Sequence, residues 1–297
     1  MLNKIFYMSD LHADHYCYDT SGITKIDRQI DEFFRLSGIS KIPADERYMF
    51  IIPGDLSNSN TVAKAVLKRL KDLFKYVIIV PGNHDLYMCS NTQAARYKFN
   101  SFNRIKEMKE FCSDNNIHYL DGNIIEIDGK RFGGLGMFWD KSYYNYLEKR
   151  EVSDAEVLNF YDNYMNDSKY IMCGEKPYKI PLAYGGSYFK TSFNAIEFFN
   201  KEYQKLQNYN DFDNIDVMIT HYVPTIPYGI KTKYAMERGT TFYMFDGEKD
   251  IERISPKIWL FGHMHDKFDF IHKDTRFLCN PLGYPGETTY TVDWFEI

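Results

Sequence analysis

Short apolar runs that stop abruptly at polar, metal-binding residue types constrain this chain more than any other feature of its sequence. The clearest run covers residues 77–81 and leads directly into Gly82-Asn83-His84-Asp85. Its length, its β-branched residues and its Pro-Gly end predict a buried strand. An amide, an imidazole and a carboxylate therefore arrive together at the carboxyl end of a strand, where open α/β sheets place their binding sites.

Four more predicted strands end in the same way. They cover residues 5–9, 48–52, 216–220 and 257–261, and the polar residues that follow them are Asp10, His12, Asp55, His221, His263 and His265. Between the first three strands, the spacing of apolar residues predicts helices over 24–37 and 60–75, the second with Asn60 as its N-cap. Strand–helix–strand units of this kind favour a largely parallel sheet.

The middle and the end of the chain predict antiparallel strands instead. A helix is expected near 98–114. Three runs follow at 117–120, 123–127 and 131–136, and they are separated by Asp121-Gly122 and Asp128-Gly129. Asp-Gly between apolar runs indicates a hairpin, so the fold is expected to be mixed α/β. Further short strands are expected at 267–272, 275–279 and 289–296.

Residues 137–214 differ from the rest of the chain because they are rich in aromatic residues, with helices predicted near 153–167 and 191–208. Two interpretations fit this segment: an aromatic-rich helical and loop insertion over the site, or helices packed on the sheet. No break in composition divides the chain, so we expect a single domain, 1–297, with the insertion at about 137–214. A long loop is expected at 222–250.

Composition limits the function classes that remain open. The 297 residues carry a formal net charge of -5 without a dense run of lysine and arginine, which argues against a nucleic-acid groove built on bulk positive charge. The five cysteines are an odd number without a close pair, so we expect free thiols and a cytoplasmic protein. No apolar run is long enough to span a bilayer.

The side chains at the strand ends are carboxylates, imidazoles and an amide, which are donors that divalent transition metals accept. They are too many for one tetrahedral ion, and two ions about 3.5–4 Å apart would use them. His263 and His265 alternate on an extended segment and would point in opposite directions unless the backbone bends. Gly262 is expected to ease that bend.

In these residues the chain resembles the calcineurin-like metallophosphoesterase superfamily. The family pattern is Asp-x-His, Gly-Asp, Gly-Asn-His-Asp/Glu, a lone His and Gly-His-x-His, and residues 9–265 match it in full. Residues 280–285 also resemble the tail of several bacterial and viral members. The resemblance implies a four-layer α/β/β/α sandwich of two mixed sheets, with a dimetal site at the carboxyl ends of the strands.

The resemblance also implies a role for each matched residue. The residues that would hold one ion are Asp10, His12, Asp55 and His265. Those that would hold the other are Asp55, Asn83, His221 and His263, so that Asp55 bridges both. His84 would face the phosphoester as a catalytic residue, and Asp85 would orient the His84 ring.

The implied activity is hydrolysis of phosphoester bonds, as a phosphatase or a phosphodiesterase. A hydroxide that bridges two divalent ions would attack phosphorus, and His84 would assist the leaving group. The ligand types suit Mn, Fe, Zn, Ni or Co. The expected partner is a phosphoester substrate, with nucleotide-like molecules among the candidates, while a membrane is not expected and nucleic acid is disfavoured. The sequence leaves the oligomeric state open.

At two positions the sequence differs from the motifs of a known subgroup of the family, and these differences narrow the range of activities to expect. Leu56-Ser57-Asn58 stands where serine/threonine protein phosphatases continue to Asp-Arg-Gly, and Asp85 stands where they have Glu, so a protein phosphatase is disfavoured. Two alternatives remain: a metal-dependent nuclease of the same fold and a non-catalytic binding scaffold. Known scaffolds of this fold have lost metal ligands or the central histidine, and this chain has lost neither.

Overall fold

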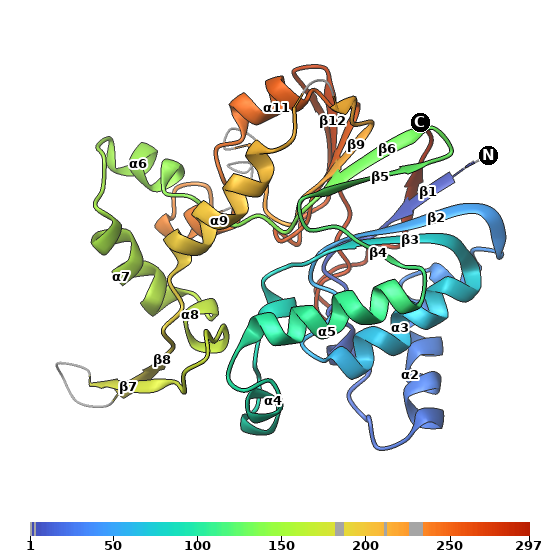
Figure 1. Ribbon diagram of the computed structural model, residues 1–297, viewed down its shortest axis with the longest axis horizontal. Coiled ribbons are helices and arrows are strands. Elements are labelled where there is room, and N and C mark those ends of the chain that lie inside the picture. The colour runs from blue at the N-terminus through green and yellow to red at the C-terminus, as the bar shows by residue number, and fades with distance from the viewer. Residues whose placement is uncertain (1, 3, 182–186, 211–212, 226–233) are drawn as a thin grey trace.

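Two large mixed sheets make up the centre of the protein. The structure is a computed structural model, and it describes the chain except for residues 1, 3, 182–186, 211–212 and 226–233 (Figure 1). Within the described residues, one large sheet has five strands, the other has six, and a two-stranded sheet stands apart.

The five-stranded sheet has the order β13-β1-β2-β3-β4. Its strands are β1 (Lys4–Tyr7), β2 (Asp45–Pro53), β3 (Phe74–Val80), β4 (His118–Tyr119) and β13 (Asp293–Phe295). β1 to β4 are parallel, in a register that pairs Ile5 with Met49 and Ile51 with Ile78. β13 is antiparallel to β1 at the edge. The predicted strand–helix–strand units are thereby confirmed.

The six-stranded sheet has the order β11-β12-β10-β9-β6-β5. Its strands are β5 (Asn123–Ile127), β6 (Lys130–Gly134), β9 (Val217–Ile219), β10 (Ile258–Leu260), β11 (Phe268–His272) and β12 (Thr275–Cys279). The four inner strands run parallel to their inner neighbours, and β5 and β11 are antiparallel edges.

Alternating side chains on each strand create the layers. In β3, Ile78 and Val80 point into a core between the two sheets, whereas Val77 and Ile79 face helices on the outer side. The outer helices of the first sheet are α2 (Ile23–Leu36), α3 (Asn60–Leu73) and α5 (Ser101–Asp114). Those of the second sheet are α9 (Ala195–Gln207) and α11 (Glu248–Ile254). The result is the expected four-layer α/β/β/α sandwich (Figure 1).

The two Asp-Gly pairs have different structures. Asp128-Gly129 joins the antiparallel strands β5 and β6, as predicted. The hairpin predicted at Asp121-Gly122 is wrong, because β4 pairs in parallel with β3 in the first sheet while β5 belongs to the second. Asp121-Gly122 is therefore the point at which the chain passes from one sheet to the other.

Several predicted boundaries also need correction. The residue that precedes α3 is Ser59, and the Asn60 side chain instead exchanges hydrogen bonds with Arg104. The helix expected near 98–114 is α5 alone, with a separate α4 (Asn91–Arg96) before it. The loop expected at 222–250 contains the 3-10 helix η4 (Arg238–Tyr243) and the start of α11, and its residues 226–233 lie outside the described part. The strand expected at 289–296 is the shorter β13.

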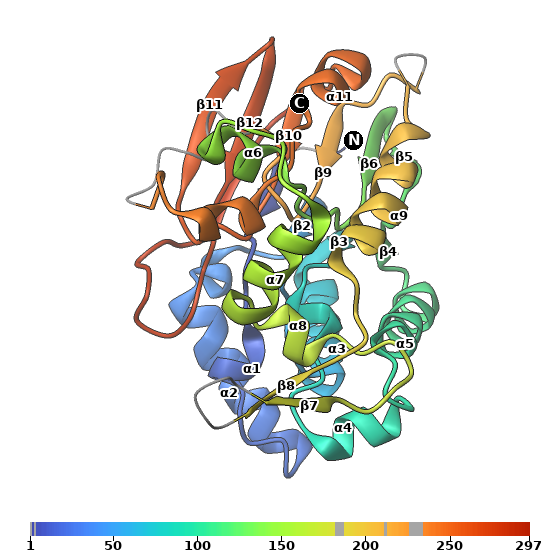
Figure 2. The same ribbon diagram turned by 90° about the vertical axis from the view of Figure 1, so that its left-hand side faces the viewer.

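The segment 137–214 forms helices and a two-stranded sheet, and some of its aromatic side chains pack in the core of the second sheet. Its elements besides α9 are α6 (Ser142–Glu148), α7 (Asp154–Tyr164), α8 (Asp167–Tyr170), β7 (Tyr178–Pro181) and β8 (Ser187–Lys190). Tyr143, Tyr144 and Tyr161 are buried in the core of the second sheet. In Figure 2, α6, α7 and α8 face the viewer, with the β7–β8 hairpin below them. Residues 182–186 and 211–212 of this segment lie outside the described residues.

Candidate metal centre

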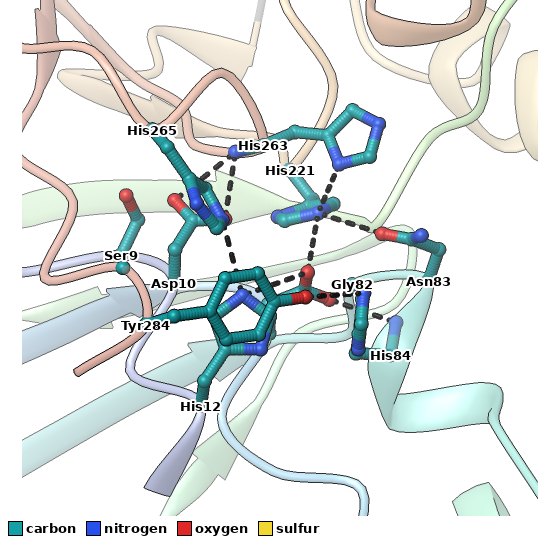
Figure 3. Close-up of polar contacts among 12 residues, drawn as sticks. Ser9, Asp10, His12, Gly82, Asn83, His84, His221, His263, His265 and Tyr284 are labelled. Atoms are coloured by element: carbon teal, nitrogen blue, oxygen red, sulfur yellow. Dashed lines mark hydrogen bonds and ion pairs between the residues drawn. The ribbon is translucent and has the colours of Figure 1, made fainter. Parts of the chain in front are cut away.

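All of the polar residues that follow the five predicted strands lie in one place. They come from the segments after β1, β2, β3, β9 and β10. In Figure 3 the side chains that point toward a common centre are those of Asp10, His12, Asn83, His84, His221, His263 and His265. Most are buried: Asp10, His12, Asp55, Asn83, His221 and His263. His265 and His84 are partly buried at the side that opens to solvent. The topology thus brings together residues up to 255 positions apart, from Asp10 to His265.

A left-handed backbone is common among these residues. The φ angles are 51° at Asp10, 39° at His12, 55° at Asp55, 69° at His263 and 51° at His265. Each such conformation in a non-glycine residue costs about 1–3 kcal/mol, and it persists only where the surroundings impose it. Five of them at one site indicate that the backbone is shaped to direct these side chains inward.

Glycines allow the loops to approach one another, which differs from the role expected of Gly262. His263 and His265 make the bend themselves, and a Cβ at Gly262 would lie 2.8 Å from both Asp10 Oδ2 and Pro53 O. A Cβ at Gly82 would lie 2.5 Å from the backbone nitrogen of Asp55. The glycines at these strand ends are needed for close contact between loops.

One group of donors surrounds the end of β1. The ligand atoms of Asp10, His12 and His265 all lie within 4.8 Å of one another. His12 Nε2 is 3.1 Å from His265 Nε2, which in turn is 3.6 Å from Asp10 Oδ1. The buried Nδ1 of His12 has no hydrogen-bond partner among the described residues.

A second group shares Asp55 with the first. Asp55 Oδ2 lies 3.4 Å from His221 Nε2 and 3.8 Å from His12 Nε2, so one carboxylate oxygen faces both groups. His221 Nε2 is also 3.1 Å from Asn83 Oδ1 and 3.2 Å from His263 Nδ1. The other ring nitrogen of His221, Nδ1, lies 2.9 Å from the Pro53 carbonyl oxygen, and this contact directs Nε2 inward.

The charges of the groups are strongly coupled. Burial opposes ionisation of Asp55, yet the imidazoles of His221, His84 and His12 hold the pKa of that carboxyl well below its usual range. Burial also opposes charge on His221, but Asp55 and Asp10 raise the pKa of its imidazole to about 9. Burial lowers the pKa of His12 and of His263. Imidazole nitrogens that face each other at 3.1–3.2 Å require a shared proton or a cation between them, and this donor set suits a divalent metal.

The partner predicted for His84 is wrong. Asp85 does not contact the His84 ring; its carboxylate accepts hydrogen bonds from the backbone N–H groups of Gly82, Asp55 and Ser57. The ring is instead oriented by Asn58, whose Oδ1 lies 3.1 Å from His84 Nδ1. Asp85 thus holds the loops after β2 and β3 together, and Asn58, three residues after Asp55, is a site residue that the sequence reasoning missed.

The tail of the chain covers the first group. Glu287 Oε2 is 2.8 Å from His265 Nδ1, and the Tyr284 ring stacks on His12 with centroids 4.3 Å apart. The Tyr284 hydroxyl is 3.4 Å from His84 Nε2 (Figure 3). The resemblance of residues 280–285 to other tails pointed to this segment, but neither Tyr284 nor Glu287 was predicted to be a site residue.

A cavity of about 550 Å³ opens onto the centre. Its described lining includes Asp55, Asn83, His84, His263 and His265 together with Tyr87, Tyr164, Tyr234, Tyr243, Tyr284, Asp266 and Glu287. Among the described residues of this lining, none is lysine or arginine. A negatively charged ligand therefore meets no lysine or arginine charge in this lining, and bound cations would add positive charge at the centre.

Comparisons with known proteins show similarity over nearly the whole chain. The profile of the family described as calcineurin-like phosphoesterase matches residues 4–267. Uncharacterized protein L509 of Acanthamoeba polyphaga mimivirus is 24% identical over 296 residues, which cover 95% of this chain and 91% of that protein. Its name states no activity.

Among solved structures, the phosphopantetheinyl hydrolase PptH from Mycobacterium tuberculosis is similar with a TM-score of 0.67 and 17% sequence identity. The similarity covers 96% of this chain and 90% of that one, and at this identity it concerns the fold. In the part of the chain that the structure describes, no helix combines the length and the apolar character needed to cross a membrane.

Proposed function

This chain belongs to the calcineurin-like phosphoesterase family, and we propose that its strand-end residues form the dimetal centre of a phosphoester hydrolase. The family is one of metallophosphoesterases that use two divalent metal ions. The residues that we assign to one ion are Asp10, His12, Asp55 and His265. Those assigned to the other are Asp55, Asn83, His221 and His263. The observation that supports this assignment best is that the two donor groups meet at Asp55 Oδ2.

When bound, two divalent ions supply Lewis acidity toward phosphoryl oxygens and lower the pKa of water toward ~7, which makes a nucleophile available at neutral pH. Manganese is our first candidate, with Fe, Zn, Ni and Co as the others. The buried carboxylates Asp10 and Asp55 leave such a centre with net positive charge, which suits a phosphoester.

His84 is proposed to assist the leaving group. Asp14 accepts hydrogen bonds from the backbone N–H and the side-chain Nδ2 of Asn58, so Asn58 Oδ1 is directed at His84. Because an amide oxygen only accepts, Nδ1 of His84 carries the hydrogen of this contact. Nε2 is then the nitrogen that faces the cavity, and in the protonated ring it can donate to the leaving oxygen.

We propose that the group beyond the phosphate is flat or nucleotide-like. Tyr164 and Tyr243 line the same cavity as His84, and aromatic side chains bind flat rings by stacking. We also propose that 1–297 is one metallophosphoesterase domain in which the insertion at about 137–214 supplies part of this wall. All five cysteines are free, which supports a reducing, cytoplasmic setting.

A substrate panel tests the function. The metal-stripped protein is assayed with each metal in turn on an aryl phosphodiester, an aryl phosphomonoester, nucleotides, a phosphopantetheinyl conjugate and single-stranded DNA. We expect turnover only with added metal and a preference for nucleotide-like phosphoesters over the aryl ones. Equal activity after exhaustive chelation would contradict the dimetal centre, and hydrolysis of DNA alone would favour the nuclease alternative.

A further inference from the structure

Among the described residues of the 137–214 segment, Asp167 is a carboxylate that contacts an assigned metal ligand. It begins the short helix α8 and is fully buried. Its Oδ1 accepts a hydrogen bond from Asn83 Nδ2 at 2.8 Å and another from the Tyr87 hydroxyl. Its Oδ2 accepts a third from the Tyr161 hydroxyl at 3.0 Å. Burial raises the pKa of Asp167, and these three donors oppose that rise.

The contact with Asn83 determines which end of the amide faces the centre. Because Asp167 Oδ1 accepts its hydrogen bond from Asn83 Nδ2, the nitrogen of the amide faces Asp167, and the amide oxygen must point the other way. That oxygen lies 3.1 Å from His221 Nε2, inside the second donor group. Only the oxygen of an amide can bind a metal, so a reversed Asn83 would present a donor that binds nothing there.

The same carboxylate also holds Tyr87, whose ring packs against His84. Tyr87 donates its hydroxyl hydrogen to Asp167, and its ring packs against the His84 ring with centroids 4.2 Å apart. The helix that carries Asp167 is also linked to the residue after Tyr87, because the Met88 N–H donates to the Tyr170 carbonyl at 2.9 Å. One buried side chain thus contacts both Asn83 and Tyr87 in the segment that follows β3.

We propose that Asp167 is a positioning residue that keeps Asn83 oxygen-inward for the second metal ion and Tyr87 in place against His84. This inference rests on the proposed function, since it assumes that Asn83 binds a metal. It makes α8 of the aromatic segment a structural part of the centre. Carboxylates that orient metal ligands typically change metal affinity about 10- to 100-fold when they are removed.

The test is the isosteric variant Asp167→Asn, which can hold either end of the Asn83 amide. Mn²⁺ binding is measured by calorimetry and by metal analysis after dialysis, alongside turnover of an aryl phosphodiester over a range of Mn²⁺ concentrations. We expect one of two Mn²⁺ ions to bind about 10- to 100-fold more weakly, while the other binds as in the unmodified protein. Activity lost at low Mn²⁺ should return in large part at high Mn²⁺.

Asp162→Asn is the matched control, because Asp162 is also buried in this segment but pairs with Lys190 and contacts no assigned ligand. It should retain both ions and full activity.

If the unmodified protein binds two ions and Asp167→Asn binds them with equal affinity, the positioning role is wrong while the dimetal function stands. If the unmodified protein binds none, both proposals are wrong. A thermal melt of each variant separates weaker binding from unfolding, and a loss that excess Mn²⁺ does not restore in a folded Asp167→Asn also contradicts the role.

Discussion

The centre has two halves that are built differently. The strand-end half consists of the assigned ligands and His84, which follow strands at the junction of the two sheets. The rim half consists of Tyr87, which follows His84 in the segment after β3, of Asp167 from α8, and of Tyr284 and Glu287 from the tail. Left-handed backbone occurs at five residues of the first half and at none of these four.

This difference teaches where the centre can tolerate change. In the strand-end half, the backbone itself directs the side chains, and glycines leave no space for an added atom. In the rim half, side chains act through hydrogen bonds and ring contacts at the edge of the cavity. Changes in the first half should abolish binding or turnover, and changes in the second should adjust affinity.

The largest effect is expected for Asp55→Asn. The variant removes the charge of the carboxylate that both donor groups share, so both ions should be lost. Turnover should fall about 1,000-fold or more, because several kcal/mol of transition-state stabilisation disappear with the ions. Metal analysis and aryl phosphodiester turnover measure this. Asp269→Asn, at an exposed carboxylate, is the control, and retention of both ions in Asp55→Asn would break the proposed sharing.

A second variant separates chemistry from metal binding within the same half. His84→Ala should retain both ions, because the ring is assigned to neither, and should lose turnover by about 100- to 10,000-fold through loss of proton transfer. Metal content and turnover are measured on the same sample. Full activity would remove His84 from the mechanism, whereas loss of an ion would place it among the ligands, as its closeness to His12 and Asp55 allows.

A third variant tests the close approach of the loops. In Gly82→Ala the new Cβ would overlap Asp55, whose backbone nitrogen would be 2.5 Å away, so the shared carboxylate must move. We expect kcat/KM to fall about 100-fold, the cost typical of a displacement near 1 Å in an active site. Gly22→Ala is the control, since a Cβ there meets nothing within 4 Å. Unchanged kinetics in Gly82→Ala would show that the strand-end half tolerates movement after all.

The same contrast explains what the sequence could predict. Strands, helices and the residues at strand ends carry local signals in their spacing, and the structure contains these elements with several boundaries shifted. The two Asp-Gly pairs are locally alike, yet one forms a hairpin and the other connects the sheets, because the difference lies in which distant strand pairs with β4. Asp85 follows His84 in sequence, but the carboxylate of Asp85 accepts a hydrogen bond from the backbone N–H of Gly82. The side chain that contacts the His84 ring nitrogen is that of Asn58.

Residues of the rim half were missed for the same reason. Asp167 and Glu287 lie far in sequence from Asn83 and His265, and no spacing relates them. An aromatic-rich segment and a tail can be recognised from sequence, but which of their polar groups reach the centre depends on packing. The assignment of the ligands themselves remains a prediction that metal binding has to test.

The smallest effect is expected at the rim, for Tyr284→Phe. The phenylalanine keeps the stacking on His12 and loses only the hydroxyl that lies 3.4 Å from His84 Nε2. Burial raises the pKa of Tyr284, so the hydroxyl stays neutral and can donate to a phosphoester oxygen that enters beside His84. One neutral hydrogen bond contributes about 1 kcal/mol, so KM should rise about fivefold while the turnover number changes little. Tyr18→Phe, at a tyrosine that is 81% exposed, should leave both constants unchanged.

If turnover by Tyr284→Phe instead falls about 100-fold or more, a loss typical of proton transfer, the hydroxyl acts in the chemical step. The division between the two halves would then have to include Tyr284 in the first.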